Sequence, residues 1–149
     1  MKTHLIKVKT DILTLDISNL AGQVFCTSRY EPEYQLSHVI WQGFMMTDAI
    51  IEAYEFMGSF ASKNGYPVTR SISDLRLTEG SFDESNQWLL EEYMPKMVKH
   101  GFKYSAILPP QDLAAKMAID FLADDADKLY TIKFFEDYEQ AYQWIIQQA

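Results

Sequence analysis

Apolar and polar residues alternate along the first 44 residues, a period that is typical of strands with one buried face. The alternating segments are 5–9, 12–17, 22–29 and 35–44. Pro32 lies between the last two and predicts a break, because proline fixes φ and has no N–H to donate. The pattern therefore predicts an antiparallel hairpin in which 35–44 returns along 22–29.

From Thr47 onward, apolar residues recur every three or four positions, which predicts helices separated by short strands. The expected strands are 70–75, 104–108 and 130–134. The expected helices are 47–63, 81–100, a segment after Pro110, and a final segment from Asp137.

Local signals predict how these helices begin and bend. Thr47 is expected to cap the first helix and Asp137 the last. Ser81, with Glu84 three residues later, fits a capping box. Pro95 lies inside the second helix and predicts a kink, since its ring cannot bond the carbonyl four residues back.

The third helix carries Leu113, Met117 and Phe121 at a spacing of four, and this stripe is expected to face the core. The acidic segment 124–127 after it is expected to be a solvated turn. Methionine and aromatic residues in general favour a core, although they also suit an adaptable apolar pocket. They are Met45, Met46, Met57, Phe60, Met94, Met97, Met117 and Phe121.

Strands that are separated by helices of this length usually pair in parallel through right-handed crossovers. The expected fold class is therefore α/β. It has a single mixed sheet of five or six strands, an antiparallel N-terminal hairpin and about four helices. Residues 1–149 are expected to form one domain, in which 1–34 is a strand-rich N-terminal extension.

Composition excludes several classes of function. The 149 residues carry 13 basic and 21 acidic groups, a formal charge of −8, whereas nucleic-acid binding needs a basic surface. Cys26 is the lone cysteine, which allows no intramolecular disulfide and suits a reducing cytosol. The longest uncharged run, 34–47, is too short to cross a membrane. The N-terminus lacks the apolar core of a signal peptide, so a cytoplasmic protein is expected.

Five segments occur in a particular order: VIWQGFMMT at 39–47, SDLR at 73–76, WLLEEYMP at 88–95, YSAILP at 104–109 and FFEDYEQAYQWI at 134–145. This order resembles the SpoIIAA-like group of the STAS/SEC14-type domains, over about residues 35–147. The resemblance implies a small mixed α/β domain without a cofactor of its own. It also implies a role in protein interaction and signalling, and its SEC14 side implies lipid binding.

In related anti-sigma-factor antagonists, a phosphorylatable serine lies at a helix N-terminus. Only Ser81 lies at a comparable position here, and the Asp-Ser-Ser-Gly-like pattern around that serine is absent. A phosphate would suit the positive end of the helix, but the acidic residues Glu79 and Glu84 would repel it. A plain N-cap is the favoured role of Ser81.

Asp74 and Arg76 are two apart on a strand and therefore share a face. They lie near the carboxyl end of an expected parallel strand, where open α/β sheets tend to bind ligands. With Glu79 they make a candidate anion-binding or acid–base cluster; the favoured alternative is an ion pair that positions the loop. Asp74, Arg76, Glu79 and Ser81 are the candidate binding residues.

The histidines have no metal-ligand spacing, so no metal site is expected. A Cys26–His38 dyad across the hairpin is an open alternative to a packed cysteine. No Walker loop, GxGxxG, GxSxG or HExxH motif occurs, so nothing argues for an enzyme.

Three hypotheses follow. The leading one is a non-catalytic cytoplasmic regulatory or protein-interaction domain, with an unknown protein partner bound through loops 76–81, 109–111 and 135–137. The second is a binder of a small apolar or lipid-like ligand, and the third is a weak enzyme that uses Asp74, Arg76 and Glu79. No cofactor is expected, and the sequence also allows a homodimer.

Overall fold

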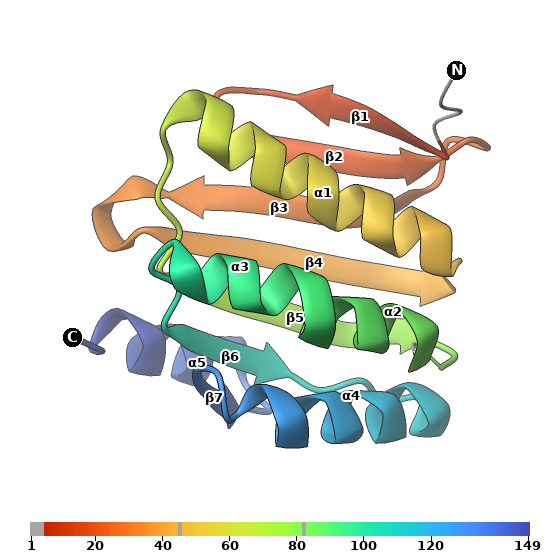
Figure 1. Cartoon of the computed structure of the whole chain (residues 1–149). Coiled ribbons are helices and arrows are strands. Elements are labelled where there is room, and N and C mark those ends of the chain that lie inside the picture. Colours follow the sequence, from red (N-terminus) through yellow and green to blue (C-terminus); the bar gives the residue numbers. More distant parts are fainter. Residues whose placement is uncertain (1–4, 45, 82) are drawn as a thin grey trace.

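Seven strands form one mixed sheet in which the spatial order of the strands is the order of the sequence, β1 to β7 (Figure 1). The structure is a computed structural model and describes residues 5–44, 46–81 and 83–149. The α/β class and the mixed sheet agree with the expectation from the sequence, but the number of strands does not.

The first four strands form an antiparallel meander rather than a single hairpin. They are β1 (Ile6–Thr10), β2 (Thr14–Asn19), β3 (Val24–Glu31) and β4 (Leu36–Phe44). The expected five or six strands were too few. β1 and β2 both join the sheet, because each buries one apolar face in the same core as the later strands, as Ile6 and Ile17 do.

The remaining strands run parallel to β4 and are joined by helical crossovers, as the sequence predicts. They are β5 (Arg70–Glu79), β6 (Tyr104–Leu108) and β7 (Thr131–Phe134). The crossovers are α1 (Thr47–Asn64), then α2 (Asp83–Trp88), η2 (Leu89–Tyr93) and α3 (Met94–Lys99), then α4 (Leu113–Ala126). These helices cover one face of the sheet, and α5 (Tyr138–Ile146) packs on the opposite face (Figure 1).

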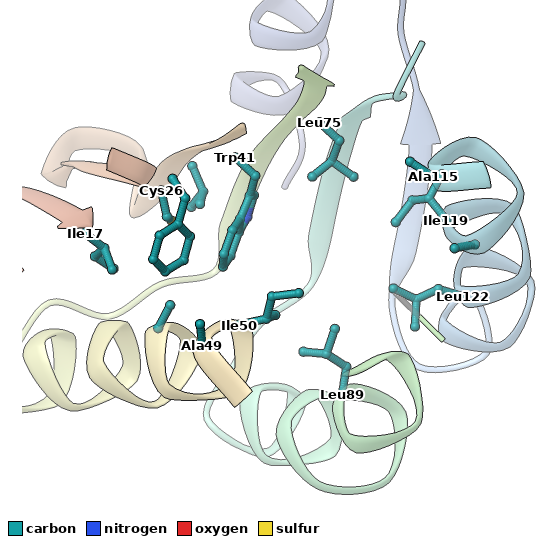
Figure 2. Close-up of a cluster of buried hydrophobic side chains, with 14 of the residues drawn as sticks. Ile17, Cys26, Trp41, Ala49, Ile50, Leu75, Leu89, Ala115, Ile119 and Leu122 are labelled. Atoms are coloured by element: carbon teal, nitrogen blue, oxygen red, sulfur yellow. The ribbon is translucent and has the colours of Figure 1, made fainter. Parts of the chain in front are cut away.

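The sheet separates two apolar clusters. In the larger one, Ile17, Cys26 and Trp41 from the strands meet side chains of three helices, among them Ile50, Leu89 and Ile119 (Figure 2). The smaller one lies under α5 and comprises Leu36, Ile72, Ala106, Leu108, Ala141 and Ile145. On the face of the sheet that carries α5, strands β1 to β3 present polar residues. α5 therefore covers only part of that face.

Two helices differ in detail from the prediction. Thr47 is the first residue of α1 and not its cap, since Met46 occupies the cap position and makes no side-chain capping bond. Around Pro95 the helix contains a π-helical turn, Leu89–Tyr93, in which the Met94 N–H donates to the carbonyl of Leu89. The wider turn fits a proline that has no N–H of its own to donate.

The buried face of α4 is not the one that the sequence predicted. Leu113, Met117 and Phe121 are exposed, although their spacing predicted a core-facing stripe. The opposite face of α4 is the buried one, and its residues are Ala115, Ala118, Ile119, Leu122, Ala123 and Ala126. The buried face carries six apolar residues, four of them alanines, against the three of the exposed stripe. α4 also extends to Ala126, so most of the expected turn at 124–127 is helical.

Candidate functional site

Asp74 and Arg76 meet on β5, as their spacing predicts. The Asp74 carboxylate accepts from Arg76 Nε at 3.0 Å and from Nη2 at 2.8 Å, and it also accepts from the Arg76 backbone N–H at 3.2 Å. The register against β4 shifts at this point, since Ile40 pairs with Asp74 but Gln42 pairs with Leu77. The ion pair lies beside an irregularity in the strand pairing, and the expected role of the pair in positioning the loop stays a prediction.

Glu79 and Ser81 lie further along the same segment and are both exposed. No hydrogen bond or ion pair among the described residues joins Glu79 to Asp74 or Arg76. α2 begins at Asp83, and position 82, which lies between Ser81 and that helix, is outside the described residues. The expected capping box therefore stays a prediction.

Asp112 ties this loop to α4. Its Oδ2 accepts from the Ala115 N–H at 3.1 Å, which caps α4, and from the Gly80 N–H at 3.2 Å. Gly80 has φ of +85°, and the ring of Phe44 lies so close that a Cβ at this position would meet it at 2.7 Å. The ends of β4 and β5 and the start of α4 are thereby held together.

A partly buried polar network that the sequence analysis missed lies around His38 of β4, against α5. His38 Nε2 lies 2.9 Å from Glu31 Oε1, and His38 Nδ1 lies 2.5 Å from the Tyr138 hydroxyl. The Tyr142 hydroxyl donates to Glu31 Oε2 at 2.6 Å. We call Glu31, His38, Tyr138 and Tyr142 the His38 network.

With Glu31 ionised and His38 neutral, each hydrogen bond of the His38 network has one donor and one acceptor. An ionised Glu31 accepts from Nε2–H, so Nδ1 of a neutral His38 accepts from the Tyr138 hydroxyl. Burial lowers the pKa of His38, aided by the charge of Arg29, while Glu31 opposes this shift. Burial of Glu31 would raise its pKa, but the hydrogen bonds from Tyr142 and His38 lower it below the usual value. The hydrogen bond to Glu31 raises the pKa of Tyr142 to about 12.

The Cys26–His38 dyad is not formed. Cys26 pairs with Trp41, whereas His38 pairs with Arg29, so the two side chains point to opposite faces of the sheet. Cys26 is buried in the cluster on the helical side, while His38 faces α5. Burial raises the pKa of the Cys26 thiol, which keeps it in its unreactive protonated form.

Part of the His38 network could have been found from the sequence. Tyr138 and Tyr142 are four apart, a spacing that places them on one side of the last helix, and both pack against the smaller apolar cluster. Glu31 and His38 lie on either side of the tight turn Pro32–Tyr34. No signal in the sequence says that this helix lies over this hairpin.

The outer surface of α4 carries a row of exposed apolar side chains. Leu113, Met117 and Phe121 are 72%, 52% and 66% exposed, and we call these three residues the α4 ridge. They occupy successive turns of one helix and therefore lie on one side of it. Phe44, Met46 and Leu77, near the carboxyl ends of β4 and β5, are exposed as well.

The apolar core offers little space for a ligand. A cavity of about 40 Å³ lies among Trp41, Tyr54, Thr78, Asn86 and neighbouring side chains, which is enough for a few water molecules. Within the described parts of the chain, no three His, Cys, Asp or Glu side chains gather as metal ligands would. None of the helices in those parts combines the length and the apolar character that crossing a bilayer requires.

A comparison of the sequence with known protein families finds no matching family, and a comparison with curated proteins finds no matching protein.

Proposed function

We propose that this protein is a non-catalytic regulatory or protein-interaction domain of the cytoplasm, similar in role to STAS domains. The observation that carries the proposal is the α4 ridge. Single exposed apolar residues are common on protein surfaces, but a contiguous row of large ones usually marks a binding surface. Three successive turns of α4 present such side chains to solvent.

The α4 ridge lies outside the core. The inner side of α4 buries six residues against the sheet and α2, and the ridge side chains are not part of that core. Because exposed leucine, methionine and phenylalanine reduce solubility, their presence favours a second role, which is contact with a partner. The ridge begins just after the expected binding loop 109–111, and Asp112 links it to the expected loop 76–81.

The polar groups favour binding over catalysis. In the His38 network each side chain is hydrogen-bonded to another member, and the neutral His38 uses both ring nitrogens. The Asp74 carboxylate is likewise occupied by Arg76. Groups that are already paired in this way hold elements in place. The alternative of a weak enzyme based on Asp74, Arg76 and Glu79 has less support, because no bond among the described residues joins Glu79 to the other two.

Photo-crosslinking in cells tests the proposal. A photoreactive phenylalanine analogue is placed at position 117, or as a matched control at Leu20, which is 54% exposed on the β2–β3 turn. We expect a discrete crosslinked species from position 117 that is absent at position 20. Equal crosslinking at both positions, or none at 117, would contradict the proposed interaction surface.

A further inference from the structure

We infer that the α4 ridge receives a basic amphipathic helix of a partner protein. This inference rests on the proposed function and adds the chemistry of the partner. It is carried by two features of the same helix surface, the row of apolar side chains and the carboxylates that flank it.

The shape of the ridge suits a helix. Leu113 and Phe121 are eight residues apart, which corresponds to about 12 Å along a helix at 1.5 Å per residue. A partner helix with apolar residues at i, i+3 or i+4, and i+7 presents a stripe of similar length, about 10 Å. Met117 lies in the middle of the ridge, and methionine adapts its shape to different apolar partners.

The charge of the ridge surface selects a basic partner. Asp120, Asp124 and Asp125 are exposed on α4, whereas Lys116 is the lone cation within the bounds of this helix. Two of these carboxylates lie in the last turn, which contains no basic residue. The helix dipole places partial negative charge at this end, so carboxylates there are unfavourable. Lysine or arginine side chains of a partner would relieve this repulsion.

The chain's own cations do little to relieve the repulsion at this end of α4. Lys128 approaches Asp125 at 3.8 Å, but both side chains are largely exposed, and such pairs contribute little to stability. The acidic flank of the α4 ridge is therefore open to an incoming positive charge.

A second copy of this chain fits the ridge less well. Each copy carries a formal charge of −8, so two copies repel one another as they approach. Like charges that face each other across an interface oppose association. The apolar row alone would allow a homodimer, so the charge is what favours a foreign, basic helix.

The test uses two synthetic fluorescent peptides of about 18 residues with the amphipathic helical pattern, one of leucine and lysine and one of leucine and glutamate. We expect fluorescence anisotropy to show that the lysine peptide binds and the glutamate peptide does not. The double variant Met117→Gln/Phe121→Gln should weaken binding about tenfold or more, and Asp120→Asn/Asp124→Asn about threefold. The matched control Leu20→Gln should leave binding unchanged, and circular dichroism should show all variants folded.

Three results would overturn the inference. One is no binding of the lysine peptide, and another is binding that Met117→Gln/Phe121→Gln leaves unchanged. The third is a dimer in sedimentation velocity that the same double variant converts to monomer, which would make a second copy the occupant. If the peptide fails but position 117 still gives a discrete crosslink to another protein, the proposed function stands and the basic helix is wrong.

Discussion

Cys26 lies in the interior between the sheet and α1, and burial raises the pKa of its thiol well above the usual value. Since the thiolate is the reactive form, we expect no reaction with a water-soluble disulfide reagent in the folded protein. Ellman's reagent should label one thiol per chain only after denaturation. The control is Cys26→Ala/Leu20→Cys, whose thiol lies on the surface and should react at once. Rapid labelling of native wild-type protein would contradict the buried position.

The His38 network makes stability depend on pH. The pKa of His38 is lowered on folding by burial, so between its folded and unfolded values the unfolded chain binds more protons. The free energy of unfolding should therefore fall as the pH decreases below the unfolded value of 6.5. The pKa of Glu31 is also lowered, so a second loss should begin below its unfolded value of 4.5.

Urea denaturation between pH 7.5 and 3.5 measures both effects. His38→Gln keeps a donor and an acceptor in the network but does not titrate. We therefore expect this variant to lose the fall in the free energy of unfolding that begins below pH 6.5, and to keep the fall that Glu31 causes below pH 4.5. Because both proteins share the general effect of charge, the difference in stability between wild type and His38→Gln isolates His38; a difference that grows in favour of wild type on acidification below pH 6.5 would show that the sign is wrong.

At the scale of elements, Asp112 connects two that are distant in sequence. Its carboxylate caps α4 through Ala115 and also holds the Gly80 N–H at the end of β5. We expect Asp112→Ala to lower the free energy of unfolding by about 1–2 kcal/mol, because N-caps contribute amounts of this size. Hydrogen exchange at the Gly80 amide should become faster in the same variant.

Two variants control for the effect of Asp112. Asparagine is as good an N-cap as aspartate, so Asp112→Asn should retain most of the stability. Asp137→Ala removes the cap of α5, where Asp137 accepts from Glu139, and should leave exchange at Gly80 unchanged. Unaltered exchange at Gly80 in Asp112→Ala would mean that the loop is held by other contacts.

At the scale of the whole molecule, the formal charge of −8 acts against compactness. Salt screens this repulsion, since the Debye length falls from about 30 Å at 0.01 M to about 8 Å at 0.15 M ionic strength. We expect the midpoint of thermal unfolding at pH 7.5 to rise by a few degrees over this range of sodium chloride. Near the sequence pI of about 4.8 the rise should disappear, and an equal rise at both pH values would argue against charge repulsion.

Much of the fold was predictable because it depends on local periodicity. The segment 104–108 was expected as a strand and forms β6, and Asp137 caps α5 through its side chain. The parallel half of the sheet followed from the alternation of helices and strands. The ion pair between Asp74 and Arg76 followed from their spacing of two on a strand.

What the sequence alone determined are the elements, the mixed α/β class and the acidic charge, since these depend on near neighbours in the chain or on composition. Only the tertiary structure decided which side of α4 is buried, because both sides of that helix carry apolar residues and their spacing alone does not choose between them. The tertiary structure alone brought Tyr138 and Glu31 together around His38, although the two residues are more than a hundred positions apart in the chain. Such contacts depend on which helix crosses which strands, and that is set by the packing of the complete sheet.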